Sequence, residues 1–324
     1  MDSLIVSSSP HVYSKDTTVR IMRDVVLALL PAAAVAVYFF GVRAALIMAI
    51  SVLSAVITEA VVQKLMKKPI TVNDWSAAVT GLMLAFNLPP TVPLWLPVVG
   101  SIVAIALVKQ AFGGLGHNFM NPALAARAIL LAAWPVYMTT WAEPIHGIVN
   151  SAADAVSSAT PLAILKGLEG TEAQLPPLWA IILGSTKGCL GETSDLALLL
   201  GAAYLLWRRV INWRIPFSFI GTVALLTWVL GPRGLFTGNA IYHIFSGGLI
   251  LGAFFMATDY SSSPVTPKGQ IIMGIGCGVI TTIIRLYGGY PEGVTYSILL
   301  MNVATPLIDR FTMPRIYGEV RADV

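Results

Sequence analysis

Residues 24–63 decide the fold. They read DVVLALLPAAAVAVYFF over residues 24–40 and, after three further residues, AALIMAISVLSAVITEAVVQ over residues 44–63. Each run is almost entirely apolar, and about 20 helical residues of this kind cross the hydrocarbon core of a bilayer. The chain is therefore predicted to open with two transmembrane helices in succession.

The composition of the whole chain agrees with a membrane protein. Of its 324 residues, 56% are hydrophobic and 11% are charged, whereas average soluble domains carry roughly 25% charged residues. The polar first 23 residues contain no apolar core, so we expect no cleaved signal peptide. The net charge of +4 comes without a dense basic run. We therefore expect membrane lipid, and no nucleic acid, around this chain.

Apolar runs recur ten times and fall into two sets of five. They lie near residues 24–40, 44–63, 76–88, 94–111, 121–134, 195–208, 215–231, 240–257, 271–287 and 294–311. Short matches link the sets: GLMLAF from Gly81 resembles GLILGAFF from Gly248, and Met120-Asn121 resembles Met301-Asn302. Because each set contains an odd number of spans, the second set crosses the membrane in the opposite direction to the first. We predict an all-α integral membrane protein with about ten transmembrane helices in two inverted five-helix repeats.

The basic residues orient this arrangement. Fourteen fall on one side: Lys15, Arg20, Arg23, Lys64, Lys67, Lys68, Lys109, Arg208, Arg209, Arg214, Lys268, Arg310, Arg315 and Arg321. Five fall on the other: Arg43, Lys166, Lys187, Arg233 and Arg285. The richer side is predicted to be cytoplasmic. The chain then divides into a cytoplasmic N-terminal segment (1–23), a first repeat (24–134), an extracytoplasmic loop with a short apolar or re-entrant piece (135–194), a second repeat (195–311) and a cytoplasmic tail (312–324).

The extracytoplasmic loop contains Asp154-Ala-Val-Ser157-Ser158-Ala159-Thr160-Pro161. Proline biases the preceding Thr160 toward an extended conformation and suits the first position of a helix. Thr160 is thus predicted to cap a helix whose N-terminus favours a phosphate ester on its hydroxyl. Two interpretations stay open from these residues alone: a flavin attachment site, or an ordinary threonine cap.

Several polar residues stand out elsewhere. Arg127 lies inside the fifth apolar run, where it could offset a carboxylate or hold an anionic cofactor group. Glu192 and Thr193 precede the sixth run, where they could line a flavin site or serve only in capping. Glu59 lies inside the second run, either on an ion path or paired with Lys64 at the membrane rim.

Three further features bear on metal and flavin binding. The cysteines, Cys189 and Cys277, lack the spacing of a self-contained iron–sulfur or zinc site. His117 and His243 have no paired ligand spacing either, so no metal is predicted, although one shared with another subunit stays open. Asp259 is followed by three serines, which suggests a capped turn or a second flavin site between the repeats.

The chain resembles a known family, the RnfD/NqrB family, along nearly its whole length. Ser9-Pro10-His11, Ile21-Met22 and Ala28–Ala32 are similar to the start of the RnfD subunit of the Rnf ion-translocating oxidoreductase complex. Asp154–Thr160 is similar to the flavinylation motif of that subunit and of the NqrB subunit of the sodium-pumping NADH:quinone oxidoreductase. Leu183-Gly-Ser185 and Gly191–Ser194 also resemble family signatures. The motif departs from many relatives at Ala155 and Ser158, where those have glycine, and the length favours the Rnf member.

The resemblance implies a specific role. Family members carry FMN joined through its phosphate to the threonine that matches Thr160, installed by a separate extracytoplasmic FAD:protein FMN transferase. Asp154, Ser157 and Ser158 belong to the matching motif. The implied complex is a ferredoxin:NAD⁺ oxidoreductase of the prokaryotic cytoplasmic (inner) membrane, coupled to Na⁺ or H⁺ movement.

Within such a complex this chain would relay electrons among integral and peripheral iron–sulfur and flavin subunits. It contains no G-x-G-x-x-G after a strand, so NAD⁺ reduction is expected on a partner, and we predict no catalytic residue or complete activity for this chain alone. A second, non-covalent flavin such as riboflavin stays open. The competing hypotheses are an inverted-repeat solute transporter or channel, and a structural anchor for redox partners.

Overall fold

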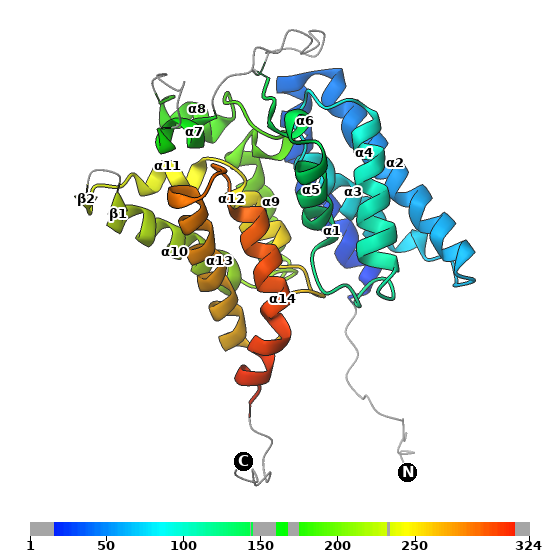
Figure 1. The fold of residues 1–324 in the computed structure, drawn as a ribbon. Coiled ribbons are helices and arrows are strands. Elements are labelled where there is room, and N and C mark those ends of the chain that lie inside the picture. The colour runs from blue at the N-terminus through cyan, green and yellow to red at the C-terminus, as the bar shows by residue number, and fades with distance from the viewer. Residues whose placement is uncertain (1–15, 143, 145–159, 168–174, 232–233, 315–324) are drawn as a thin grey trace, which may run out of the picture.

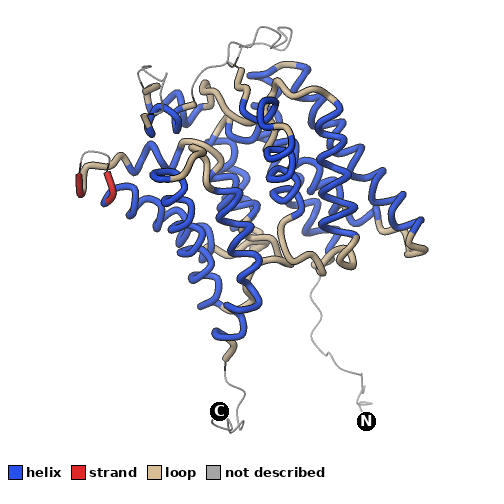
Figure 2. Tube along the Cα trace, viewed as in Figure 1, coloured by secondary structure: helices blue, strands red, loops and turns tan. Residues whose placement is uncertain are grey.

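The fold is a bundle of helices. The computed structural model describes residues 16–142, 144, 160–167, 175–231 and 234–314. Among these residues the strands are confined to one small antiparallel sheet, in which β1 (Leu230–Gly231) pairs with β2 (Gly234–Leu235) (Figure 2). All other regular structure in these ranges is helical, as the apolar runs predict.

The elements follow one another in two stretches. Before the loop that contains Asp154–Thr160 lie α1 (Thr18–Phe40), α2 (Val42–Leu65), η1 (Val72–Asp74), α3 (Ser76–Phe86), α4 (Trp95–Ile102), η2 (Val103–Gln110), α5 (Pro122–Ala133) and α6 (Pro135–Thr139). After it lie α7 (Pro161–Lys166), α8 (Leu178–Leu183), η3 (Leu190–Glu192), α9 (Asp195–Trp207), α10 (Arg214–Val229), α11 (Ala240–Phe245), α12 (Leu249–Leu251), η4 (Gly252–Met256), α13 (Pro267–Tyr287) and α14 (Val294–Thr312).

Each apolar run predicted from the sequence contains helix. Helices α1, α2 and α13 are long and apolar enough to cross a membrane. Shorter apolar helical stretches cover Ser76–Phe86, Trp95–Gln110, Pro122–Ala133, Asp195–Trp207 and Arg214–Val229. The chain is therefore an all-α membrane protein. Helix α1 starts at Thr18, earlier than predicted, because Thr17 caps it by accepting a hydrogen bond from the Arg20 N–H at 3.3 Å.

The run predicted as one helix over residues 240–257 is broken. It forms α11, α12 and the π-helical η4, and the break falls at Ser246-Gly247-Gly248. Gly247 has a φ of 74°, a left-handed conformation that interrupts a helix and that glycine adopts at low cost. The run over 94–111 likewise changes from α-helix to the π-helical η2. Hydrophobicity locates such runs but does not show where their backbone changes.

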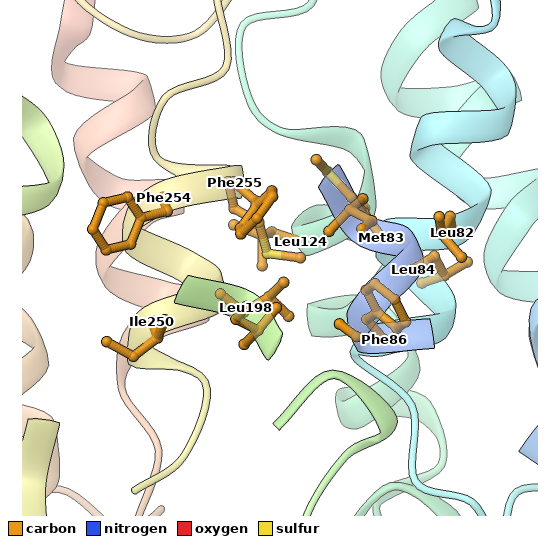
Figure 3. Packing of buried hydrophobic residues seen from close by; sticks show 14 of the residues in the cluster. Leu82, Met83, Leu84, Phe86, Leu124, Leu198, Ile250, Phe254 and Phe255 are labelled. Atoms are coloured by element: carbon orange, nitrogen blue, oxygen red, sulfur yellow. The ribbon is translucent and has the colours of Figure 1, made fainter. Parts of the chain in front are cut away.

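The core lies where the two stretches of chain meet. Figure 3 shows Leu84 and Phe86 from α3, Leu124 from α5, and Leu198 from α9 converging in one cluster with residues of α12 and η4. Leu84 and Phe86 are completely buried. This shared core places elements from both stretches around the sites described below.

Helices α1 and α9 pack directly against each other at a small-residue contact. A Cβ atom at Gly201 in α9 would lie 2.0 Å from the backbone oxygen of Ala28 in α1. Toward one end of this contact, Asp24 accepts hydrogen bonds from Tyr204 at 2.9 Å and from Arg208 at 3.0 Å. The contact joins the first and second stretches of chain.

Candidate functional site

Thr160 has the geometry that the Thr-Pro sequence predicts. Its backbone is extended, with a φ of −74° and a ψ of 158°, and Pro161 is the first residue of α7. The Thr160 hydroxyl oxygen accepts a hydrogen bond from the Ala163 N–H at 3.3 Å, and the side chain remains partly exposed. Asp154, Ser157 and Ser158 lie outside the described residues. The one described member of the motif is thus an accessible threonine cap.

The short helix α7 is fixed to the end of α13. The Lys166 ammonium group donates hydrogen bonds to the carbonyl oxygens of Gly288, Ile284 and Tyr290, the last two at 3.4 and 3.3 Å. These carbonyls belong to the C-terminal end of α13 and the loop after it, where a cation complements the helix dipole. On its other side, Leu162 packs against Gly247, close enough that a Cβ there would lie 2.5 Å from Leu162 Cδ1.

A buried polar cluster surrounds the Arg127 guanidinium group. Arg127 Nη1 donates to Asn87 Oδ1 at 2.9 Å, and Nη2 donates to Glu292 Oε2 and to Cys189 Sγ, the latter at 3.6 Å. Glu192 Oε1 lies 4.0 Å from the same Nη2. Arg127 thus has a carboxylate partner, which is one of the two interpretations left open for it, and the interpretation as a ligand of an anionic cofactor group stays a prediction.

Glu292 was not identified from the sequence, although it is a central member of this cluster. It lies in the loop between α13 and α14, far from Arg127 along the chain. The sequence marks it only as an acidic residue between Pro291 and Gly293, in the short segment that separates two apolar runs. Such a position fits an ordinary turn equally well, so the pairing of Glu292 with Arg127 could not be predicted without the three-dimensional structure.

The Glu192 carboxylate lies in a cradle of glycines. A Cβ at Gly188 would lie 2.9 Å from Glu192 Oε2, and a Cβ at Gly248 would lie 3.2 Å from Oε1. The Cys189 N–H donates to Oε2 at 3.4 Å. Burial raises the pKa of Glu192 well above its ordinary value, and Glu292 raises it further. Thr193 is buried and its hydroxyl donates to the Leu190 carbonyl at 2.5 Å, so it serves the local backbone.

Cys189, Glu192 and Glu292 bring one sulfur and two carboxyl groups within 4.8 Å of one another. Arg127 lies among all three and supplies the positive charge there. A metal cation would have to displace or share this position with a guanidinium group, which electrostatics disfavours. The cluster is therefore a hydrogen-bonded ion-pair network, and its donor set does not fit a metal.

A cavity that is partly open to solvent lies elsewhere between the two stretches of chain. Its polar lining includes Ser76, Lys109, Asn118, Asn121, Asp259 and Tyr260, and its apolar lining includes Phe254 and Phe255.

Asp259 is held firmly at this cavity. Its Oδ2 accepts from Ser262 at 3.0 Å, Ser261 at 3.1 Å and Asn118 at 3.4 Å. Burial raises the pKa of Asp259. The serines thus form the polar turn that the sequence suggested.

Glu59 is paired, but not with Lys64 as the sequence suggested. Its Oε1 lies 2.7 Å from Lys109 Nζ, and both side chains are almost completely buried. Lys109 also donates to Ser76 Oγ at 2.6 Å, and Gln110 donates to Glu59 at 2.7 Å. The one partner considered from the sequence was Lys64, a neighbour one helical turn away, whereas packing of η2 against α2 brings in a partner from a later helix. The alternative, a place on an ion path, stays a prediction.

Comparison with known proteins gives consistent matches over nearly the whole chain. The model of the NQR2, RnfD, RnfE family matches residues 5–318. The D subunit of the Na(+)-translocating ferredoxin:NAD(+) oxidoreductase complex of Acetobacterium woodii is 58% identical over 322 residues, covering 98% of this chain and 96% of the relative. The D subunit of the proton-translocating counterpart from Clostridium ljungdahlii is 48% identical over 324 residues, covering 98% and 96%. The D subunit of the ion-translocating oxidoreductase complex of Stutzerimonas stutzeri is 41% identical over 331 residues, covering 93% and 92%.

Proposed function

The chain belongs to the NQR2, RnfD, RnfE family, and from this premise we propose that it is the membrane subunit of an ion-translocating ferredoxin:NAD⁺ oxidoreductase that carries FMN on Thr160. In this role it relays electrons between partner subunits while the complex moves Na⁺ or H⁺. The names of the first two relatives above differ in the ion, one Na⁺ and the other H⁺. The family alone therefore does not select the ion.

The observation that carries the flavin proposal is the geometry of Thr160. Its hydroxyl is partly exposed at the start of α7, and the short helix is held in place by Lys166. A phosphoester at this hydroxyl would lie beside the first N–H groups of a helix, an environment that favours an anion. When bound, the flavin supplies one- and two-electron chemistry. The residues of this chain attach it, orient it and fix its position on the bundle.

The arrangement of the helices supports the proposed orientation. Helix α1 begins and α14 ends at one end of the bundle, whereas α7 and α8 lie at the opposite end (Figure 1). With both termini in the cytoplasm, as the basic residues predict, Thr160 faces the outside, where the transferase acts.

Helix packing supports the two inverted repeats. Helix α2 packs against α3 and α4, and α10 packs in the same way against α11 and α13. The equivalent helices α1 and α9 contact each other, as do α5 and α14. These matching contacts are what a pseudo-twofold relation between two sets of five spans would produce.

The cavity beside Asp259 supports the second, non-covalent flavin. Its aromatic walls and fixed polar groups resemble those of ordinary ligand pockets. In the proposed topology it opens toward the cytoplasm, and both repeats line it. We assign riboflavin to it because the polar groups there are already paired with one another, which suits an uncharged ligand better than a phosphate.

The two flavin sites then lie toward opposite faces of a hydrocarbon core of about 30 Å. Electrons therefore have to cross on cofactors held together with neighbouring subunits. The proposal places the NAD⁺ and ferredoxin sites on cytoplasmic partners. For NAD⁺ this agrees with the described part of the chain, which contains no dinucleotide-binding βαβ unit.

The decisive experiment is covalent flavin labelling. Native complex co-expressed with the transferase should fluoresce in a denaturing gel, and peptide mass analysis should place one FMN on the peptide that contains Thr160. Thr160→Ala should abolish this signal, whereas Thr160→Ser keeps a hydroxyl and should retain part of it.

Thr266 provides a matched control. It also precedes a proline and caps a helix, accepting from the Gly269 N–H at 3.0 Å, but it lies at the predicted cytoplasmic end. Thr266→Ala should therefore leave labelling unchanged. A flavin-free native protein, or FMN on another residue, would refute the proposal and favour the transporter or anchor hypotheses.

A further inference from the structure

The Arg127 cluster contains two carboxyl groups and one directly bonded cation. An oxygen of Glu192 and an oxygen of Glu292 lie within 4.8 Å of each other. Two ionised carboxylates this close repel each other, so a proton held on one of them is favoured. Arg127 contacts Glu292 directly but lies 4.0 Å from Glu192 Oε1. The geometry therefore gives Glu292 the direct hydrogen bond to the cation and leaves Glu192 with only the longer ion pair.

Glu192 Oε1 is the unsatisfied atom of the cluster. The Glu192 side chain is 7% exposed, and its Oε1 has no hydrogen-bond donor among the described residues. A buried ionised oxygen without a donor is costly, whereas a protonated one becomes a donor itself. Glu292 Oε2, held by Arg127, is an acceptor within the same cluster.

The other charged and titratable neighbours do not change this balance. Arg285 of α13 favours the ionised form of Glu292, and its Nη atoms donate to the carbonyl oxygens of His243 and Ser246. Burial raises the pKa of the Cys189 thiol and the neighbouring Glu192 carboxylate raises it further, which keeps the thiol protonated. Tyr296 of α14 lies toward Arg127.

We propose that Glu192 and Glu292 form a proton-binding site, in which one proton is shared between the two carboxyl groups with Glu192 as the donor and Glu292 as the acceptor. The Glu292 side chain is 21% exposed, three times as much as Glu192. It is therefore the group through which the pair exchanges its proton with water.

The site lies next to the flavin-bearing helix. Gly247 packs against Leu162 in the first turn of α7, and the adjacent Gly248 packs against Glu192 Oε1. This link rests on the proposed function: a proton leaving the complex on the outside would be released here, at the end of the bundle that presents Thr160.

Infrared difference spectroscopy of the purified complex tests the shared proton directly. At pH 7, wild-type complex minus Glu192→Gln should show a protonated-carboxyl C=O band that shifts in D₂O. Glu292→Gln should keep this band at a shifted frequency, because its amide oxygen still accepts from Glu192. Glu59→Gln is the matched control: Glu59 is equally buried but has the Lys109 ammonium as its partner, so the band should stay.

Labelling glutamate with ¹³C at the side-chain carboxyl assigns the band in wild-type complex, even where a variant fails to assemble. A wild-type spectrum without a protonated glutamate at pH 7 would overturn the proposal. So would a stoichiometric metal ion that is lost in Cys189→Ser. Repeating the measurement in Thr160→Ala separates this result from the flavin proposal, since the pair should keep its proton without flavin.

Discussion

The α1–α9 contact predicts that a single methyl group will separate the two stretches of chain. In Gly201→Ala the new Cβ would lie 2.0 Å from the Ala28 carbonyl oxygen, and ordinary contact begins at 3.4 Å. The shortfall is 3.4 − 2.0 = 1.4 Å. The obstacle is backbone, which cannot rotate away as a side chain could. The helices themselves have to move apart or tilt.

The cost of this movement follows from the packing around it. Overpacking a well-filled interface typically costs about 1–3 kcal/mol. Membrane helices depend strongly on close packing at small residues, because lipid provides no hydrophobic force between them. We therefore expect Gly201→Ala to lower the apparent melting temperature of the purified subunit by several degrees.

The assay is thermal unfolding in detergent, read as the loss of the monodisperse peak in size-exclusion chromatography. The matched control is Gly221→Ala, at a glycine of α10 where an added Cβ meets no described atom within 4 Å. This variant should be neutral or slightly stabilising, because alanine favours helix over glycine. If both variants melt alike, or if Gly201→Ala matches the wild type, then the close approach of α1 and α9 is not as described.

Three further predictions concern the sites. Lys166→Met should lower flavin labelling of Thr160, measured as in-gel fluorescence per mole of subunit, because α7 loses its hydrogen bonds to the end of α13. Membrane insertion should be unaffected, and full labelling would contradict this prediction. The pKa of Glu192 is raised in the folded state, so its contribution to the free energy of unfolding is complete below the ordinary pKa of glutamate and is lost as pH rises through the folded-state pKa, by up to about 1.4 kcal/mol per pH unit. The melting temperature should therefore decline with pH in the wild type, and Glu192→Gln should flatten this decline. An unchanged pH profile in Glu192→Gln would argue against the raised pKa. Asp259→Leu should release the non-covalent flavin of Thr160→Ala complex during gel filtration, as measured by acid extraction, whereas equal retention would place that flavin elsewhere.

The positions of the helices could be predicted from the sequence, because burial in lipid requires long apolar runs and the basic residues mark their ends. The backbone inside the runs could not. The run over 240–257 reads as one span, yet Gly247 breaks it. Glycine is also common in unbroken membrane helices, so the sequence does not show whether the helix breaks at Gly247.

The cap geometry of Thr160 depends on Thr160 and Pro161, so it could be predicted from two adjacent residues. The partners of Arg127 and Glu59 were not local. Glu292 reaches Arg127 only through the packing of α14 against α5. Lys109 reaches Glu59 because η2 lies along α2. Sequence reasoning favours partners one helical turn away, and here tertiary contacts decided both pairs.

The attachment of α7 to α13 sets the depth of the proposed flavin. Lys166 ties α7 to carbonyl oxygens at the far end of a 21-residue helix that is long enough to span the membrane. In the proposed orientation, the height of Thr160 relative to the bilayer therefore follows the tilt of α13. A rocking movement of that helix would raise or lower the cofactor relative to redox centres in neighbouring subunits, and so change the length of the electron-transfer step.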